Sequence, residues 1–158
     1  MNVTIEKYDA RYWEDICRIH DAARKIELEY ASLMDAFLPL EAVVEEEGLF
    51  EYKHVEVALL DEQVVGFCAY SEDELAWLYV RPENMRTGIG KQLVAHALET
   101  EKSIYYIEVL FGNEPAKWLY ERFGFLEREI ISGRMPGNEQ FHVKVYGMYR
   151  DIQQSHSG

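Results

Sequence analysis

A glycine turn between an apolar strand and an amphipathic helix limits most strongly what this chain can fold into. Residues 75–80 are apolar, aromatic or β-branched, as strand residues usually are, and Pro82 ends the strand because proline has no backbone N–H. From Ile89 onward, apolar residues recur at the three- and four-residue spacing of a helix. Gly88 and Gly90 lie at the junction. The sequence therefore predicts a strand, a turn and a helix in succession.

A turn of this kind is suited to binding an anion. The first N–H groups of a helix have no acceptor within it, and the helix dipole adds partial positive charge at that end. A phosphate or pyrophosphate is the natural ligand. Two phosphate-binding motifs do not match. A P-loop needs glycine at Met85 and serine or threonine at Gln92, and a dinucleotide-binding fingerprint needs a small residue at Leu93.

The stretch instead follows the pattern (Gln or Arg)-x-x-Gly-x-(Gly or Ala) after a strand that ends Val-x-Pro. Val80-Arg81-Pro82 and Gly88-Ile89-Gly90 fit, whereas Met85 stands where glutamine or arginine is usual, and Arg86 where glycine is common. In this respect the chain resembles the GNAT superfamily of acyl-CoA-dependent N-acyltransferases. The resemblance implies that main-chain amides of the turn bind the pyrophosphate of coenzyme A, so Met85 removes a side-chain contact but no amide.

A second stretch carries the same resemblance. Asn113, Ala116, Leu119-Tyr120 and Gly124-Phe125 look like the family's N-x-x-A-x-x-L-Y-x-x-x-G-F signature. The order of the expected elements is also similar to that of the family: strand, two helices, three strands, helix, strand, helix, two strands. This order predicts an α/β (α+β) fold in which a mixed, mostly antiparallel sheet of about seven strands is flanked by about four helices. We expect one domain over residues 1–150 and a flexible polar tail at 151–158.

The expected elements follow from periodicity and turn residues. Asp9 is a predicted N-cap for a first helix, the pattern is indistinct over residues 24–38, and Pro39 is expected to begin a second helix that Gly48 ends. A loop is expected around Gly133, Pro136, Gly137 and Asn138. The expected strands are residues 2–7, 55–60, 64–70, 75–80, 104–109, 125–132 and 141–149, and two further helices begin at residues 89 and 114.

Charge and cysteine content restrict the possible partners and compartment. The 158 residues include 29 acidic and 16 basic side chains, for a formal net charge of −13, which disfavours nucleic acid as a partner because phosphate binding needs a basic face. Cys17 and Cys68 lie in separate apolar segments and are expected to be free thiols, as in a reducing compartment. We find no signal peptide and no apolar run near the ~20 residues of a membrane span, so a cytoplasmic protein without membrane contact is expected.

The candidate catalytic residues come mainly from the resemblance. Acetyl transfer from a thioester to an amine requires a neutral amine and protonation of the departing thiolate. Tyr120 corresponds to the family's general acid, although a core tyrosine would also lie on this apolar side of the helix. Glu74, six residues before Val80, corresponds to the family's glutamate base. Strand parity would place it with Ala76 and Leu78 on one side of the strand. The alternatives to Glu74 are Glu72, Asp73, Glu108 and solvent water.

The cosubstrate implied by the resemblance is acetyl-CoA, bound where the strands at 75–80 and 104–109 diverge and leave main-chain groups free. The basic residues Arg81, Arg86, Lys91, Lys117 and Arg122 gather near the expected phosphate site or on the later helix. Asn113 would contact the pantetheine arm, and it is equally a good N-cap. The predicted cofactor-binding residues are Leu78, Tyr79, Val80, Met85, Arg86, Thr87, Gly88, Ile89, Gly90, Lys91, Asn113 and Lys117.

The acceptor pocket is expected, by resemblance, between the first two helices and the loop joining the last two strands. Acidic residues there would suit an amine, whereas Arg24 or Arg134 would suit an acceptor that also carries a carboxylate. Trp77 and Tyr79 are expected in the core. The histidines show no spacing typical of metal ligands, so no metal site is predicted. The candidate acceptor residues are His20, Arg24, Glu27, Glu29, Tyr30, Asp35, Arg134 and Met135.

The sequence thus predicts an N-acetyltransferase that moves an acetyl group from acetyl-CoA to a primary amine of a small molecule, peptide or protein. Direct attack in a ternary complex is expected, because no nucleophile motif is present. A catalytically silent acyl-CoA-binding or sensing module is the alternative, and an unrelated α/β nucleotide-binding protein is a third hypothesis. The hydrophobic content of 48% is compatible with a homodimer and does not require one.

Overall fold

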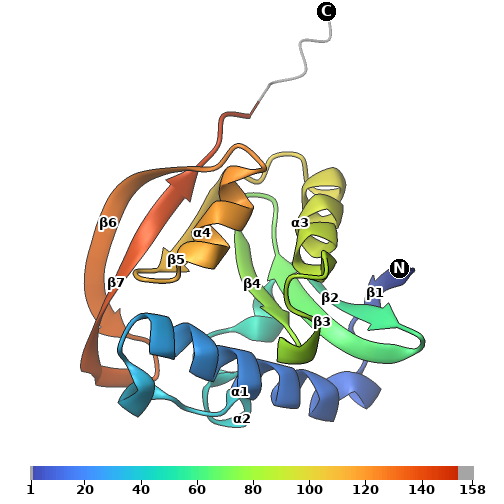
Figure 1. Ribbon diagram of the computed structural model, residues 1–158, viewed down its shortest axis with the longest axis horizontal. Coiled ribbons are helices and arrows are strands. Elements are labelled where there is room, and N and C mark those ends of the chain that lie inside the picture. Colours follow the sequence, from blue (N-terminus) through green and yellow to red (C-terminus); the bar gives the residue numbers. More distant parts are fainter. Residues whose placement is uncertain (1, 153–158) are drawn as a thin grey trace, which may run out of the picture.

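The computed structural model describes residues 2–152 and contains, within them, seven strands and four α-helices (Figure 1). The strands are β1 (Val3–Lys7), β2 (His54–Leu60), β3 (Gln63–Tyr70), β4 (Leu75–Val80), β5 (Tyr106–Leu110), β6 (Leu126–Met135) and β7 (Asn138–Tyr149). The helices are α1 (Trp13–Tyr30), α2 (Leu40–Val43), α3 (Ile89–Thr100) and α4 (Glu114–Glu121). The predicted fold class is confirmed. Residues 153–158 of the expected tail lie outside the described residues.

The strands form two sheets that meet at a single point. β1, β2, β3 and β4 are neighbours in one antiparallel sheet, and β5, β7 and β6 form a second antiparallel sheet in that order. One parallel bridge, between Glu74 and Tyr106, joins β4 to β5. Beyond this bridge the two strands have no ladder between them in the described part of the chain. The parallel component of the predicted mixed sheet is therefore confined to this bridge.

Helices cover both faces of the first sheet (Figure 1). On one face, α3 and α4 bury a cluster that includes Leu93, Tyr120 and Phe125. On the other face, α1 and α2 bury a cluster that includes Phe67 and Trp77. The expectation that Trp77 lies in the core is met. Because each face of the sheet is apolar, each requires its own helical layer.

The indistinct region of the sequence proves to be mostly helical. A short 3₁₀ turn at Ala10–Tyr12 is capped by Asp9, and α1 then continues to Tyr30. Pro39 directly precedes the four-residue helix α2 and is not its first residue. The expected last loop is also corrected. Gly133 lies within β6, and only residues 136 and 137 separate β6 from β7.

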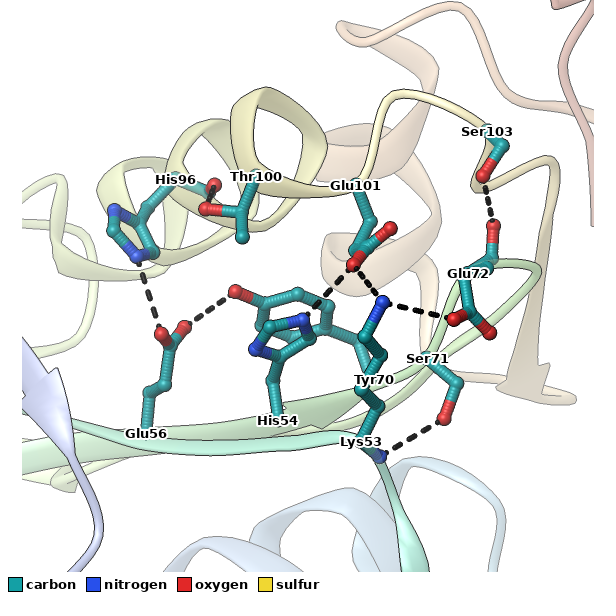
Figure 2. A network of polar contacts seen from close by, with 10 residues as sticks. All are labelled: Lys53, His54, Glu56, Tyr70, Ser71, Glu72, His96, Thr100, Glu101 and Ser103. Atoms are coloured by element: carbon teal, nitrogen blue, oxygen red, sulfur yellow. Dashed lines mark hydrogen bonds and ion pairs between the residues drawn. The ribbon is translucent and has the colours of Figure 1, made fainter.

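A polar network ties the C-terminal end of α3 to β2 and β3 (Figure 2). Glu101, just after α3, lies 2.8 Å from the Lys53 ammonium and 3.0 Å from the His54 ring. Glu56 on β2 accepts a 2.7 Å hydrogen bond from the buried Tyr70 hydroxyl and lies 3.3 Å from His96 on α3. The network therefore fixes the helix whose other end is the glycine turn.

Both cysteines are free thiols in the structure, as the sequence predicted: Cys68 is buried and Cys17 is partly buried. Among residues 2–152, no helix combines the length and the apolar character needed to cross a membrane.

Candidate active site

A cleft of about 680 Å³ opens between the C-terminal half of β4 and helix α4, with α1 along its third side. The edge of β4 that faces β5 has no strand partner beyond the Glu74 bridge among the described residues. An unpaired strand edge can bind an extended ligand through main-chain hydrogen bonds. The predicted cofactor-binding residues that line the cleft are Leu78, Tyr79, Val80, Met85, Arg86, Gly88, Gly90, Lys91 and Asn113.

The glycine turn presents a row of free backbone N–H groups to this cleft. None of the N–H groups from Arg86 to Lys91 has an acceptor among the described residues, and the first backbone bond of the helix comes from Gln92 to the Gly88 carbonyl at 3.0 Å. Arg86 and Gly88 adopt the left-handed conformation, with φ of 64° and 92°. Successive amides in such a turn converge on one side and favour an anion.

Exposed cations lie beside these free amides, but not all those that the sequence suggested. Arg86 and Lys91 line the cleft, and Arg122 joins them from α4. Arg81 does not: its Nε donates to Asn84 at 2.6 Å, and its side chain lines a separate hollow beside α1. Its grouping with the phosphate site is therefore wrong.

Three predicted cofactor-binding residues lie outside the cleft lining. The Thr87 hydroxyl donates to the Asn84 carbonyl. Ile89 is the first residue of α3, and its side chain is fully buried. Lys117 lies 3.0 Å from Glu127 and over the ring of Tyr146. Thr87 and Ile89 can still offer their backbone N–H groups, whereas Lys117 is engaged on the other side of α4.

Tyr120 lies on the buried side of α4 and packs edge-to-face against Phe125. The Tyr120 hydroxyl has no hydrogen-bond partner in the described residues. Every fully buried side-chain polar atom in those residues does have a partner. The hydroxyl oxygen must therefore reach accessible space. Burial raises the pKa of Tyr120, and electrostatic interactions with Glu27 and then Cys68 act in the same direction. The phenol stays protonated at neutral pH, as a proton donor must.

Glu27 on α1 links the elements that surround the cleft. It accepts a 3.0 Å hydrogen bond from the Tyr79 hydroxyl on β4 and forms an ion pair with Arg24. The Asn113 amide, which precedes α4, lies 3.5 Å from its other oxygen. Asn113 also caps α4, because its carbonyl oxygen accepts the Ala116 N–H at 3.3 Å. The capping function expected of Asn113 is thus confirmed, and it uses only the side-chain oxygen Oδ1.

Glu74 lies at the closed end of the separation between β4 and β5, outside the cleft lining. Burial raises its pKa, and the nearby carboxylates of Glu108 and Asp73 raise it further. A carboxylate with a raised pKa is better matched to accepting a proton near neutral pH. The three residues named as alternatives to Glu74 differ: Asp73 and Glu108 are its neighbours, whereas Glu72 lies 2.8 Å from Lys53 in the network of Figure 2.

The strand parity expected for Glu74 is wrong. Leu75 pairs with Tyr70 and Trp77 pairs with Ala69, so Ala76 is an extra residue that forms a β-bulge. Leu78 packs into the core beneath α3, whereas Ala76 packs on the α1 side. Because a bulge shifts the alternation of side chains, residues on either side of it cannot be assigned to one face by counting.

The candidate acceptor residues separate into three groups. His20, Arg24 and Met135 line a narrow hollow between α1, α2 and the β6–β7 turn, and burial lowers the pKa of His20. Glu27 and Tyr30 line the main cleft. Glu29, Asp35 and Arg134 are exposed and line neither space.

Sequence reasoning missed several residues of these two spaces. Ile26, Trp118 and Leu119 line the cleft, and 60% of Trp118 is exposed. The signal available in the sequence was a tryptophan outside the apolar stripe of Ala116, Leu119 and Tyr120. Glu47 lines the narrow hollow, and its burial raises its pKa even though Arg24 acts in the opposite direction. Glu47 lies within a run of acidic residues, so nothing in the sequence distinguished it from an exposed glutamate. Within residues 2–152, no group of three or more His, Cys, Asp or Glu side chains could hold a metal ion.

Comparisons with known proteins agree with this geometry. Residues 51–127 match the family model of the acetyltransferase (GNAT) domain. This region contains β4, the glycine turn, α3 and α4. No curated protein matches the chain in sequence.

Several solved structures share the fold over almost the whole chain. Apo-form YjaB from Escherichia coli is 23% identical with a TM-score of 0.68, and the match covers 94% of this chain and 97% of that one. The ribosomal-protein-S18-alanine N-acetyltransferase from Escherichia coli is 18% identical with a TM-score of 0.71, covering 99% and 98%. A GCN5-related N-acetyltransferase from Rhodopseudomonas palustris is 15% identical with a TM-score of 0.74, covering 96% and 97%. Identities this low establish the shared fold alone.

Proposed function

The chain carries a GNAT acetyltransferase domain, and from this premise we propose that it is an N-acetyltransferase that uses acetyl-CoA to acetylate a primary amine. The family match confirms the resemblance predicted from the two motifs and the assignment to the acetyltransferases. The substrate class and the residue roles given below are our proposal.

The observation that carries the proposal is the row of unpaired amides from Arg86 to Lys91 at the mouth of the cleft. These groups fit the pyrophosphate of coenzyme A, and Arg86, Lys91 and Arg122 supply positive charge in a chain whose net charge is −13. The pantetheine arm would then follow the free edge of β4, where main-chain groups of Leu78 and Val80 are available.

The proposed chemistry is direct transfer within a ternary complex. The acceptor amine loses a proton to Glu74, directly or through water, and its nitrogen then attacks the thioester carbonyl. As the carbon–sulfur bond breaks, Tyr120 gives its phenolic proton to the departing thiolate, and the surplus proton on the newly acylated nitrogen restores the phenol. Deprotonating a lysine-like amine with a pKa near ~10.4 costs roughly 4.6 kcal/mol at neutral pH, so a base with a raised pKa is useful. The raised pKa of Glu74 supports this role.

We propose a cationic amine as the acceptor, because carboxylates outnumber the cations beside the narrow hollow. Glu27 and Glu47 lie near a single guanidinium, that of Arg24, and Glu47 has no ion-pair or hydrogen-bond partner among the described residues. An incoming ammonium group would balance the second carboxylate. The free thiols of Cys17 and Cys68 support a cytoplasmic location in this proposal, and the formal net charge of −13 disfavours a nucleic-acid partner.

A thiol-release assay with acetyl-CoA over a panel of amines, amino acids and peptides tests the activity, and calorimetric titration with coenzyme A tests the site. We expect coenzyme A binding and release of free thiol with at least one cationic amine. Binding without thiol release on any member of the panel would favour the silent acyl-CoA-binding module. Absence of coenzyme A binding would refute both, and binding of ATP or NAD instead would favour a nucleotide-binding protein.

A further inference from the structure

Strand β6 is an unprotected sheet edge. It lies at the end of the order β5-β7-β6, so its outer edge has no partner in the described part of the chain. All of its ten residues except Met135 are exposed. Natural sheet edges are usually short, charged, interrupted by proline or covered by another element. We therefore expect a ten-residue edge strand that is exposed on both faces to pair with another strand.

The side chains of β6 favour contact between two copies of the chain, whereas the net negative charge of the whole molecule opposes it. Leu126, Ile130 and Ile131 have exposed fractions of 53%, 52% and 37%. The strand carries two acidic and two basic residues and is therefore neutral, whereas the whole chain has a formal charge of −13. Charges elsewhere on the surface oppose contact between two copies of the chain, but this strand does not.

Pairing with β7 shows which residues of β6 share a face. Glu127 pairs with Met148, which packs in the cluster beneath α4. Arg134 pairs with His142, six residues before Met148 on β7 and therefore on the same face. Ile131 pairs with Val145 on the opposite side. The register shifts between Glu127 and Glu129, so Arg128 is an extra residue in a bulge. The side chains of β6 alternate between the two faces of the sheet only if Arg128 is left out of the count.

We propose that β6 pairs antiparallel with β6 of a second copy of this chain about a two-fold axis at Ile131. Residues that face each other in an antiparallel pair must lie on the same face of the sheet. Centring on Ile131 satisfies this condition along the whole strand. The pairs that result are Ile131 with Ile131, Ile130 with Ser132, Glu129 with Gly133, Glu127 with Arg134, and Leu126 with Met135.

Charge complementarity supports a second copy as the partner and this register in particular. Because the axis repeats every contact, two Glu127–Arg134 pairs form on the α4 side of the sheet. Arg134 forms no ion pair with an acidic residue of its own chain among the described residues. Glu127 contacts Lys117 through one carboxylate oxygen, Oε2, which leaves the other oxygen for the arginine. A shift by one pair in either direction leaves at least one of these charges unmatched.

Sedimentation equilibrium of the full chain over a concentration series tests the proposal. We expect a dimer, and Arg134→Glu should raise its dissociation constant roughly tenfold or more, since two favourable cross-strand pairs become two repulsive ones. Adding Glu127→Arg to Arg134→Glu reverses both charges and should restore the dimer. Ile131→Lys, which places two like charges on the axis, should give monomers.

Arg128→Glu is the matched control, because it makes the same charge change in the same strand at the bulged residue that this register leaves unpaired. It should leave the dissociation constant within about twofold. Circular dichroism checks that each variant is folded. A wild-type chain that stays monomeric throughout the series, or a dimer unaffected by Arg134→Glu and Ile131→Lys, would overturn the proposal. So would a charge-swapped double variant that remains monomeric.

Discussion

Glu74 and Tyr106 form a parallel bridge that marks the point where β4 and β5 part. The two sheets are joined at this pair, and after it the facing edge of β4 has no strand partner in the described residues. The proposed base therefore lies at the closed end of the separation, and the amides of the glycine turn lie beyond the other end of β4. A thioester whose diphosphate is held at the turn would extend along β4 toward Glu74.

Replacing Glu74 by glutamine should lower turnover roughly 10²-fold, because the base would be lost while the strand bridge, which uses backbone atoms, remains. The affinity for coenzyme A should stay within a few-fold of wild type. Single-turnover kinetics combined with calorimetric titration would separate these effects. Unchanged turnover would exclude Glu74 as the base and leave Asp73, Glu108 and solvent water as the alternatives.

The pH profile of kcat/KM should reflect the surroundings of Glu74. A base works when it is deprotonated, and its pKa is raised above 4.5 by burial, Glu108 and Asp73, so the acidic limb should lie above pH 4.5. Glu108→Gln removes one of these causes and should move the limb to lower pH. A limb that moves upward or stays in place would contradict the role of Glu74.

Removing the Tyr120 hydroxyl by Tyr120→Phe should reduce turnover by roughly 10²-fold, because the departing thiolate would lose its acid. Binding of acetyl-CoA and thermal stability should change little, since the hydroxyl has no partner to lose. Tyr146→Phe is the matched control: its hydroxyl donates to Glu114 at 2.9 Å, outside the cleft lining. Equal activity in the two variants would remove Tyr120 from the mechanism.

Gly88→Ala tests the turn itself. At a φ of 92° a side chain costs roughly 1–2 kcal/mol, and nothing lies within 4 Å of the added methyl group. The surface turn should therefore relax and misalign its amides, weakening coenzyme A binding about tenfold in calorimetry. Gly133→Ala, which has equally open surroundings but no positive φ, should bind normally. Equal affinities would place the diphosphate elsewhere.

The network in Figure 2 can be tested through its buried hydroxyl. Glu56→Ala leaves the fully buried Tyr70 hydroxyl without its 2.7 Å acceptor and should lower the free energy of unfolding by roughly 1–3 kcal/mol. In a Tyr70→Phe background the same substitution should cost clearly less. Denaturant titration of the four proteins measures the coupling, and simple additivity would show that the contact contributes nothing.

Glu101 predicts a pH dependence of stability. Hydrogen bonds from Lys53 and then His54 lower its pKa below 4.5, so its contribution is present above that pH and is lost as the pH falls below it. Thermal melts from neutral pH to about pH 3 should show a smaller acid-induced loss in Glu101→Gln than in wild type. Parallel curves would exclude this contribution.

Local patterns in the sequence were sufficient for the centre of the molecule. The strand at Leu75–Val80, the helix start at Ile89 and the capping of α4 by Asn113 all agree with the structure. Each depends on residues a few positions apart: an apolar run, a glycine in the left-handed conformation, and a side chain that accepts a nearby N–H. Such signals require no knowledge of distant contacts.

Other features depended on contacts between residues far apart in the sequence. The pattern was indistinct around Arg24 and Glu27 because these polar residues are half-buried and are satisfied by one another and by Tyr79. Gly133 suggested a loop because glycine is frequent in turns, yet pairing with β7 holds it in a strand.

The sequence by itself determined the fold class, the glycine turn that begins α3 and the two motifs, because local backbone preferences and apolar periodicity specify them. Only the tertiary structure decided that β4 bulges at Ala76, that Arg81 and Lys117 are engaged away from the cleft, and that β6 is left as an open edge. The physical reason is that strand register and side-chain pairing are set by partners distant in the chain.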